Sequence, residues 1–346
     1  MRLHRSQLIP ALVAIAAIAL GACSATSADS SGGPAEPTTE GITLYSGRIP
    51  AAIGGAVDMY EAQADRDVQV RYGETGDLAA TLVEEGDNSP ADVFFAQEPG
   101  AIGAVADRGL LAKLPQDILD RVPPQYRDPQ GRWVGVTGRA RVIAYGPTVK
   151  ESELPDSPLG LTDPQWKGRV GWSPASDSLQ HYVTALRLQY GDDAARKWLE
   201  DMVANDAVEY PDNVSIRDAI ANGEIDVGLI NHYYVAQAVA AEGPDYPVKV
   251  YFPPQGLGSL LLLTSVGVLE SSDRKDEAFD FIRTLLSRQG QTFFTSSSKE
   301  YPLAKGVPAD PSLTVPLSKI PPSPGNLSDI GATQATIQLM QEAGAL

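Results

Sequence analysis

The feature that most restricts the fold of this chain is an alternation of strand-like and helix-like segments near its start. Short β-rich runs at residues 42–45, 68–72 and 91–95 are each followed by a stretch whose apolar residues recur at helical spacing. Strands that alternate with helices pair in parallel, because each helix carries the chain back along the sheet. The sequence therefore predicts a parallel α/β sheet for this part of the chain.

The same two kinds of segment continue over the rest of the 346 residues. No internal repeat of fixed period is visible, and at roughly 100–200 residues per domain the chain has room for two medium-sized units. We therefore expect two α/β units. Further strands are predicted at 141–145, 225–230 and 260–268, and further helices around 183–188, 198–202, 278–286 and 328–346.

The first 22 residues are typical of a secretory signal. Arg2 and Arg5 precede an apolar run at 8–20, which is too short for a membrane-spanning helix. The run ends in Leu-Gly-Ala-Cys, which resembles the bacterial lipobox. That resemblance implies removal of residues 1–22 and lipidation of Cys23, so the mature protein is expected to be exported and lipid-anchored to the outer face of the cell membrane.

Composition excludes several classes of protein. Cys23 is the single cysteine, so a disulfide framework and a cysteine-based zinc site are excluded. Residues 23–40 continue from it as a tract rich in Ser, Gly, Pro and Thr, which predicts a flexible tether. With 44 acidic against 27 basic side chains, the formal charge of −17 argues against nucleic acid as a partner.

Motifs for catalysis are missing from the sequence. No Gly-x-Ser-x-Gly, His-Glu-x-x-His or phosphate-binding Gly-rich loop occurs. Of three histidines, His4 lies in the predicted signal, which leaves His181 and His232. We therefore expect no enzymatic activity and keep an exported hydrolase as the less favoured alternative.

Two adjacent tyrosines follow the strongly apolar strand predicted at 225–230. Asn231 and His232 break this strand, so Tyr233 and Tyr234 are predicted at a strand-to-helix turn, where α/β sheets bind ligands. Neighbouring side chains diverge within a regular helix or strand, but in a turn both can face one ligand. Two phenolate oxygens suit Fe³⁺. The alternative, in which one tyrosine packs in the core and the other at the surface, stays open.

The run Asn231-His232-Tyr233-Tyr234 resembles the Asn-x-Tyr-Tyr signature of bacterial ferric-iron-binding periplasmic proteins, the substrate-binding receptors of iron(III) ABC transporters. Further matches follow in chain order from about residue 42 to the end: Tyr45-Ser-Gly-Arg48, Gly73-Glu-Thr75, Ser89-Pro-Ala-Asp92, Gly138-Arg-Ala-Arg141, Trp166-Lys-Gly168, Glu300-Tyr-Pro-Leu303 and Glu342-Ala-Gly344. The ordered series is more specific than any one of these short runs.

This resemblance implies an α/β architecture, the two-lobed type II periplasmic-binding-protein fold. Hinge crossovers are expected near 138–145 and 258–268. The N-terminal lobe is expected to contain residues 41–140 plus about 265–315. The C-terminal lobe is expected to contain residues 141–264 plus about 316–346. Such lobes close around a ligand that lies between them.

The resemblance also implies roles for single residues. Tyr233 and Tyr234 match the paired tyrosinate ligands of Fe³⁺. Glu98, the one charged residue beside a ligand position of the N-terminal lobe, is expected as a further ligand of the metal, and a solvated loop carboxylate is the alternative. The residues expected to hold a synergistic anion, phosphate or carbonate, are Ser176, Ser178, Asn213, Asn231, Arg139 and Arg141. Which of the two arginines faces the cleft stays open.

Departures from the family pattern affect the expected cargo. Many members carry a histidine after the first strand, where this chain has Ile49 and Pro50. Gln97 and Gln180 stand at two other ligand positions. The expected function is a monomeric receptor that binds ferric iron with an anion and delivers it to an ABC permease and ATPase. Chelated iron, an organophosphate or a thiamin-like cation are the alternative cargoes.

Overall fold

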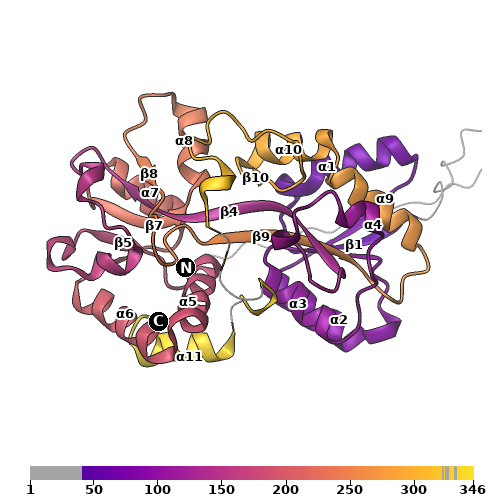
Figure 1. Cartoon of the computed structure of the whole chain (residues 1–346), viewed down its shortest axis with the longest axis horizontal. Coiled ribbons are helices and arrows are strands. Elements are labelled where there is room, and N and C mark those ends of the chain that lie inside the picture. Colours follow the sequence, from indigo (N-terminus) through magenta and orange to yellow (C-terminus); the bar gives the residue numbers. More distant parts are fainter. Residues whose placement is uncertain (1–40, 322, 324–326, 331–332) are drawn as a thin grey trace, which may run out of the picture. The chain divides into compact units, whose positions relative to one another are not determined.

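The structure is a computed structural model that describes residues 41–321, 323, 327–330 and 333–346 (Figure 1). The predicted signal at 1–22 and the tether at 23–40, with Cys23, lie outside the described residues. All described residues belong to one compact unit. No helix in this part of the chain is both long and apolar enough to span a membrane.

The strands join in the order β2-β1-β3-β9-β4-β7-β5-β6. β1 (Ile42–Ser46) pairs in parallel with β2 (Val68–Tyr72) and β3 (Val93–Ala96), which confirms the parallel arrangement predicted from the alternation. β9 (Leu261–Val268) runs antiparallel to β3, so the sheet as a whole is mixed. The other strands of this order are β5 (Val170–Trp172), β6 (Val208–Glu209) and β7 (Val227–Asn231).

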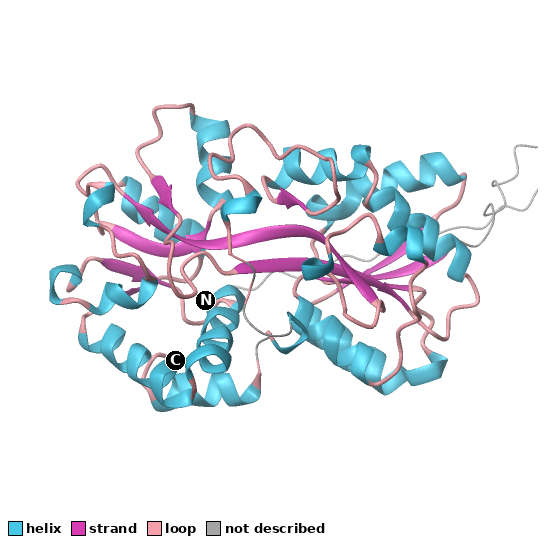
Figure 2. Cartoon of the chain, in the orientation of Figure 1, coloured by secondary structure: helices cyan, strands magenta, loops and turns pink. Residues whose placement is uncertain are grey.

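One strand belongs to both halves of the sheet. β4 (Trp133–Tyr145) is buried throughout and pairs with β9 along Trp133–Ala140 and with β7 along Arg141–Tyr145. Figure 2 shows β4 as a long strand that continues from one half of the sheet into the other. The strand predicted at 141–145 thus extends further back, because β9 supplies a hydrogen-bonding partner for the preceding residues. β8 (Lys249–Tyr251) and β10 (Tyr301–Pro302) pair with β4 as well.

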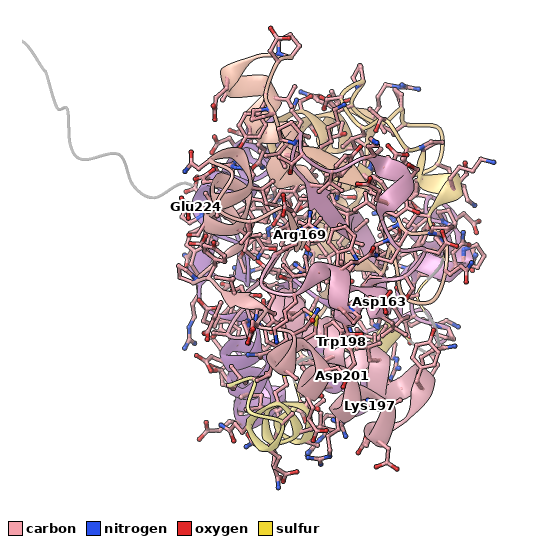
Figure 3. All side chains as sticks on the ribbon, turned by 90° about the vertical axis from the view of Figure 1, so that its left-hand side faces the viewer. Asp163, Arg169, Lys197, Trp198, Asp201 and Glu224 are labelled. Atoms are coloured by element: carbon pink, nitrogen blue, oxygen red, sulfur yellow. The ribbon has the colours of Figure 1, made fainter. Side chains whose placement is uncertain are left out.

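The helices pack on the sheet in groups that share apolar faces. α6 is amphipathic: Trp198 and Met202 are buried, whereas Lys197 and Asp201 form an ion pair of 2.8 Å on its outer side (Figure 3). The helices are α1 (Pro50–Ala64), α2 (Thr75–Glu85), α3 (Pro99–Asp107), α4 (Gln116–Leu119), α5 (Asp177–Tyr190), α6 (Asp192–Ala204), α7 (Asn213–Ala221), α8 (Tyr233–Glu242), α9 (Lys275–Leu285), α10 (Arg288–Ser298) and α11 (Gln334–Glu342). Short 3₁₀ segments lie at Gly86–Asn88, Pro124–Tyr126, Glu151–Glu153, Pro158–Thr162, Pro164–Trp166, Leu317–Lys319 and Leu327–Asp329.

The last helix is shorter than the sequence predicted. It was expected over 328–346, but α11 begins at Gln334, where the Thr333 hydroxyl caps it by accepting a hydrogen bond from the Thr336 backbone N–H. The sequence does not predict α10, because this helix is dominated by Ser, Thr and Gln, and Phe294 is the one apolar side chain among the buried residues Gly290, Gln291, Phe294, Thr295 and Ser298. The lobe limits proposed from the sequence stay a prediction.

Replacing Phe281 by alanine tests the apolar packing of α9. This side chain is fully buried and meets the Tyr60 ring edge-on, with 5.3 Å between ring centroids. The cavity left behind is expected to lower the free energy of unfolding by about 3–5 kcal/mol. Urea denaturation measures this, and Leu188→Ala, at a site that is 52% exposed, is expected to cost less than about 0.5 kcal/mol. Equal losses in the two variants would contradict the packing described.

Candidate functional site

The tyrosine pair lies where β7 passes into α8. Asn231 ends the strand, His232 is the N-cap, and Tyr233 and Tyr234 are the first two residues of the helix. The predicted strand-to-helix junction is present, but its turn is His232, and both tyrosines already belong to the first helical turn. Their rings nevertheless lie together, with 4.4 Å between centroids. Helical side chains tilt toward the N-terminus, so at the start of a helix both can project over the end of the preceding strand.

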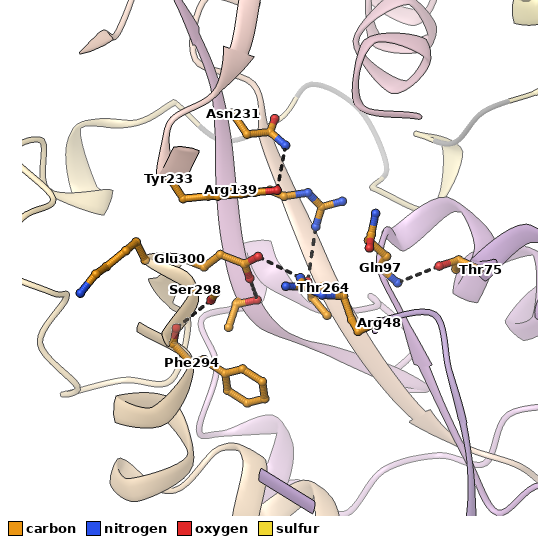
Figure 4. Close-up of polar contacts among 12 residues, drawn as sticks. Arg48, Thr75, Gln97, Arg139, Asn231, Tyr233, Thr264, Phe294, Ser298 and Glu300 are labelled. Carbon is orange, nitrogen blue, oxygen red and sulfur yellow. Dashed lines mark hydrogen bonds and ion pairs between the residues drawn. The ribbon is translucent and has the colours of Figure 1, made fainter. Parts of the chain in front are cut away.

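Both tyrosines line one cavity of about 390 Å³, here named the tyrosine pocket. Its walls come from the start of α1, the turn after β3, the middle of β4, the start of α8 and the end of α10. The polar residues that line it are Arg48, Gln97, Arg139, Tyr233, Tyr234, Gln237, Ser297, Ser298 and Glu300. Figure 4 shows several of them with their hydrogen bonds. Segments far apart in the chain therefore build a single pocket.

A buried ion pair forms one wall of the tyrosine pocket. Arg48 Nη1 lies 2.8 Å from Glu300 Oε1 and donates to Thr264 Oγ1 at 3.0 Å (Figure 4). The Thr137 hydroxyl donates to the other Glu300 oxygen. Burial alone would raise the pKa of Glu300, but Arg48, Arg139 and the Thr137 hydroxyl hold it below its usual value. Glu300 is therefore ionised, and its charge is taken up by Arg48.

Arg139 is the arginine that faces the tyrosine pocket. Its Nη1 donates to Thr264 Oγ1 at 3.4 Å, and it forms no ion pair with another residue that the structure describes. Arg139 also opposes the burial effect that raises the pKa of Tyr234. Arg139 therefore adds a positive charge to the pocket, and no carboxylate of the described residues forms an ion pair with it.

Arg141 lies buried behind the pocket and gathers several of the residues predicted to bind an anion. Its Nη1 donates to Asn213 Oδ1 at 2.7 Å, to Ser178 Oγ at 2.9 Å and to Asn231 Oδ1 at 3.3 Å, and its Nη2 donates to the Leu229 carbonyl at 2.7 Å. Burial lowers the pKa of Arg141 to about 10, so the group stays charged at neutral pH. The amide oxygens of both asparagines are thus occupied, and their N–H groups are the donors left for a ligand.

Ser176 lies next to this group as the N-cap of α5, where its hydroxyl donates to the Ser173 carbonyl at 2.7 Å. Asn231 Nδ2 reaches the Tyr233 hydroxyl at 3.5 Å, a long contact that connects the Arg141 group to the tyrosine pair (Figure 4). The structure thus brings Ser178, Asn213, Asn231 and Arg141 together. It places Arg139 separately, in the tyrosine pocket itself.

Glu98 does not share a cavity with the tyrosines. Its neighbour Gln97 lines the tyrosine pocket, whereas Glu98 lines a second cavity of about 810 Å³. Glu98 is only 6% exposed, so the alternative of a solvated loop carboxylate is wrong. Burial raises the pKa of Glu98 to about 7, against the opposing effect of Arg139.

His232 points away from the tyrosine pocket. Its Nδ1 accepts a hydrogen bond from the Ala140 backbone N–H at 3.1 Å, so its Nε2 donates to the Lys299 carbonyl at 3.1 Å. The ring stacks on Tyr301 with 4.8 Å between centroids. Burial lowers the pKa of His232 to about 4, because the charged imidazole would lose its water. His232 therefore holds the start of α8 on β4 and is not a candidate ligand.

Arg48 and Glu300 are pocket residues that no sequence motif identifies as such. Both lie inside runs that resemble the family, Tyr45-Ser-Gly-Arg48 and Glu300-Tyr-Pro-Leu303. Their positions in these matching runs are the sequence signal that could have identified them as site residues. Among the described residues, no three His, Cys, Asp or Glu side chains gather where they could hold a metal ion. A metal in the tyrosine pocket would therefore depend on phenolate oxygens and on ligands taken from solution.

A two-lobed α/β fold with a polar pocket at the ends of its strands defines a solute-binding receptor. The chain belongs to the family of bacterial extracellular solute-binding proteins, whose model matches residues 88–319. This family is one of receptors and not of enzymes. The prediction of the receptor family from the Asn-x-Tyr-Tyr run and the ordered matches is confirmed.

Two named homologues are consistent with membership of the solute-binding protein family. The Fe(3+)-binding periplasmic protein of Serratia marcescens is 33% identical over 91% of this chain and 94% of its own length. The major ferric iron-binding protein of Neisseria meningitidis is 30% identical over 90% of this chain and 95% of its own length. Both are named for ferric iron.

Solved structures confirm the predicted fold class. Iron-bound HitA from Pseudomonas aeruginosa superposes with a TM-score of 0.81 at 34% identity and covers 88% of this chain and all of its own. A Trichodesmium protein in complex with iron and citrate superposes with a TM-score of 0.76 at 28% identity, again over 88% of this chain and all of its own.

Acidification is expected to destabilise the protein through His232. The unfolded histidine takes up a proton near its ordinary pKa of 6.5, whereas the buried one stays neutral down to about pH 4. The unfolded state therefore binds more protons in this window, and stability present above pH 6.5 is lost as the pH falls toward 4. Between pH 7.5 and 5 this amounts to roughly 2 kcal/mol. Urea unfolding at both pH values measures the difference.

The variant His232→Gln is the matched comparison for this pH dependence, because it removes the titrating group and keeps a donor and an acceptor. We expect the difference in unfolding free energy between the two pH values to shrink in the variant. His181 is retained as the second buried histidine of the described residues. An unchanged difference would show that His232 is not a source of the acid sensitivity.

Proposed function

We propose that this protein is an extracytoplasmic receptor that binds ferric iron through Tyr233 and Tyr234 and delivers it to an ABC permease and ATPase. The observation that carries the proposal is the convergence of the two phenols in one pocket at the end of β7. Fe³⁺ is a hard cation that prefers anionic oxygen to sulfur. The relatives named for ferric iron support the same cargo.

Iron binding in this pocket requires the loss of phenol protons. Burial raises the pKa of Tyr234, and the neighbouring Tyr233 raises it further. Tyr234 is therefore protonated at neutral pH, and Fe³⁺ must displace phenol protons to form tyrosinates. Uptake of iron is expected to release protons and to weaken as the pH falls.

The charges of the pocket favour an anion bound together with the metal. Fe³⁺ and two tyrosinates leave one positive charge, and Arg139 adds another, whereas Arg48 is offset by Glu300. Arg141 contributes a third from behind the tyrosines. A divalent or trivalent anion would offset this excess, which supports a synergistic anion such as phosphate or carbonate.

The donors for this anion are the groups gathered around Arg141. Arg141 holds the amide oxygens of Asn213 and Asn231, so the Asn213 amide N–H groups and the Asn231 N–H that does not reach the Tyr233 hydroxyl can donate to the anion. Ser176 and Ser178 lie at the start of α5, where helix N–H groups favour phosphate or carboxylate. We assign Arg139 to the same anion from the side of the pocket.

A chelated form of iron is the second candidate cargo, and the wall opposite the tyrosines favours it. That wall offers Ile49 and Gln97, neither of which supplies an anionic ligand. The pocket of about 390 Å³ is larger than a bare ion requires. A chelator with several carboxylates would fill the remaining coordination sites and meet Arg48 and Arg139. The relative with bound iron and citrate supports this arrangement.

The proposed location and assembly depend on the sequence and on the pocket. A lipid anchor at Cys23, reached through the tether at 23–40, would keep the receptor at the outer face of the membrane. Cys23 lies outside the described residues, so the proposal comes from the Leu-Gly-Ala-Cys run alone. Both walls of the tyrosine pocket come from one chain, which supports a monomeric receptor.

Removal of both phenols is the direct test of the ferric proposal. Ferric citrate added to the wild-type protein is expected to produce a visible absorption band from tyrosinate-to-iron charge transfer. The double variant Tyr233→Phe with Tyr234→Phe is expected to lose the band and its retained iron, because the start of α8 then offers no phenolate oxygen to the pocket. Tyr190→Phe, on exposed α5 surface, is the control. A colourless wild-type protein would refute the proposal.

The role of an anion is tested separately with Arg139→Gln. Removing this charge is expected to weaken iron retention in phosphate buffer by about tenfold or more, as for the loss of a charge-assisted hydrogen bond. Competition against a chelator, with and without phosphate, measures the effect. Arg196→Gln, which breaks an exposed ion pair with Glu342, is the control. Identical retention in both variants would exclude Arg139 from anion binding.

A further inference from the structure

The second cavity, here named the acidic cavity, is separate from the tyrosine pocket, and the two share no lining residue. One wall consists of α2 and α3, from the residues just before each helix to Val83 and Asp107, and the other of the start of α5 with the segment Leu327–Asp329. Its carboxylates are Glu74, Asp77, Glu98, Asp107, Asp177 and Asp329. Among the described residues, no lysine or arginine lines it. The cavity therefore presents concentrated negative charge.

Two buried polar atoms in this cavity lack partners. Glu98 Oε2 makes no hydrogen bond although the residue is only 6% exposed, and His181 Nδ1 makes none although the residue is 2% exposed. Buried polar atoms are nearly always paired in folded proteins, so both are candidates for contact with a ligand. Burial raises the pKa of Glu98 to about 7, so a bound cation would stabilise its ionised form.

Helix termini do not account for this arrangement. Glu98 and Glu74 are the N-cap residues of α3 and α2, but neither side chain caps its helix. Each helix start contributes roughly half a positive charge, and the three starts that meet here are outweighed by the carboxylates. The unpartnered oxygen of Glu98 is thus not explained as a cap.

The chemistry of the lining favours an organic cation over a metal ion. A metal needs several oxygen or nitrogen ligands that converge on one point, and the described residues contain no such group of three. Here the acidic side chains are divided between the two walls, and the wall formed by α2 and α3 also carries small apolar side chains: Ala79, Ala80, Val83, Ala101 and Ala104. Methylene groups fit such a surface, and ammonium groups fit its acidic margins.

We propose that the acidic cavity is a second binding site, which takes a small linear diammonium compound with Glu98 on one wall and Asp177 on the other. Neither residue lines the tyrosine pocket, although Asp177 lies between Ser176 and Ser178, which are proposed for the anion. Each carboxylate would accept charge-assisted hydrogen bonds from one ammonium group. His181 Nδ1 offers a further acceptor beside Asp177 on α5.

Isothermal titration of the whole, iron-free protein with 1,4-diaminobutane tests the site. We expect saturable binding to the wild type, and weaker binding by about tenfold or more in Glu98→Gln and in Asp177→Asn, as expected for the loss of one charge-assisted hydrogen bond. Asp193→Asn is the matched control, because Asp193 also lies in the first turn of a helix but outside the cavity. The two cavity variants are independent, so misfolding of one leaves the other as the test.

Several outcomes would overturn the proposal: no saturable binding to the wild type, equal binding of 1-aminobutane or Mg²⁺, or unchanged binding in both cavity variants. The iron site is checked in parallel with ferric citrate. The double variant Tyr233→Phe with Tyr234→Phe is expected to lose the visible band and to keep the diamine. If the wild-type protein shows the visible band with ferric citrate but does not bind the diamine, only this inference is refuted. If it binds the diamine but shows no visible band, only the ferric proposal is refuted.

Discussion

The buried charge of Arg141 is the interaction on which the site depends. It lies where β4 leaves β9 and joins β7, and removing a guanidinium from water costs several kcal/mol unless oxygens surround it. Those oxygens come from Ser178 on α5, Asn213 on α7, and Asn231 on β7. Because one cation requires all of them, it fixes the starts of two helices against the end of a strand. The groups proposed to bind an anion are thus held in place by Arg141 itself.

The turn after β3 separates two cavities of opposite character. Gln97 faces the tyrosine pocket with its arginines, whereas the next residue, Glu98, faces the acidic cavity. Arg139 acts electrostatically on both Glu98 and Tyr234, so the two cavities are coupled although no residue lines both. A chain with a formal charge of −17 thus holds one locally positive pocket. Cargo selection in the tyrosine pocket therefore depends on its local charged groups, which oppose the overall negative field of the protein.

The sequence predicted the structural features that depend on residues close to one another along the chain. Periodicity located the parallel strands β1 to β3, and the apolar run before Asn231 located the end of β7. It could not show that β4 begins at Trp133, because the first part of that strand, Trp133–Ala140, pairs with β9, which follows much later in the chain. The ion pair of Arg48 with Glu300 joins positions 252 residues apart in the chain. Whether Glu98 lines the acidic cavity or the tyrosine pocket depends on the path of the backbone in the turn after β3. No local pattern contains either fact.

Hydrogen bonds attach both walls of the tyrosine pocket to the same short stretch of β4. The His232 backbone N–H donates to the Ala140 carbonyl at 3.0 Å, and its ring accepts from the Ala140 N–H, which fixes the residue directly before Tyr233. Glu300, which holds Arg48, accepts from the hydroxyl of Thr137 on the same strand. The tyrosines and the facing arginine therefore keep their relative positions through one buried strand. Such preorganisation reduces the conformational entropy lost on binding, so affinity here depends chiefly on the charge and the oxygen ligands that the cargo brings with it.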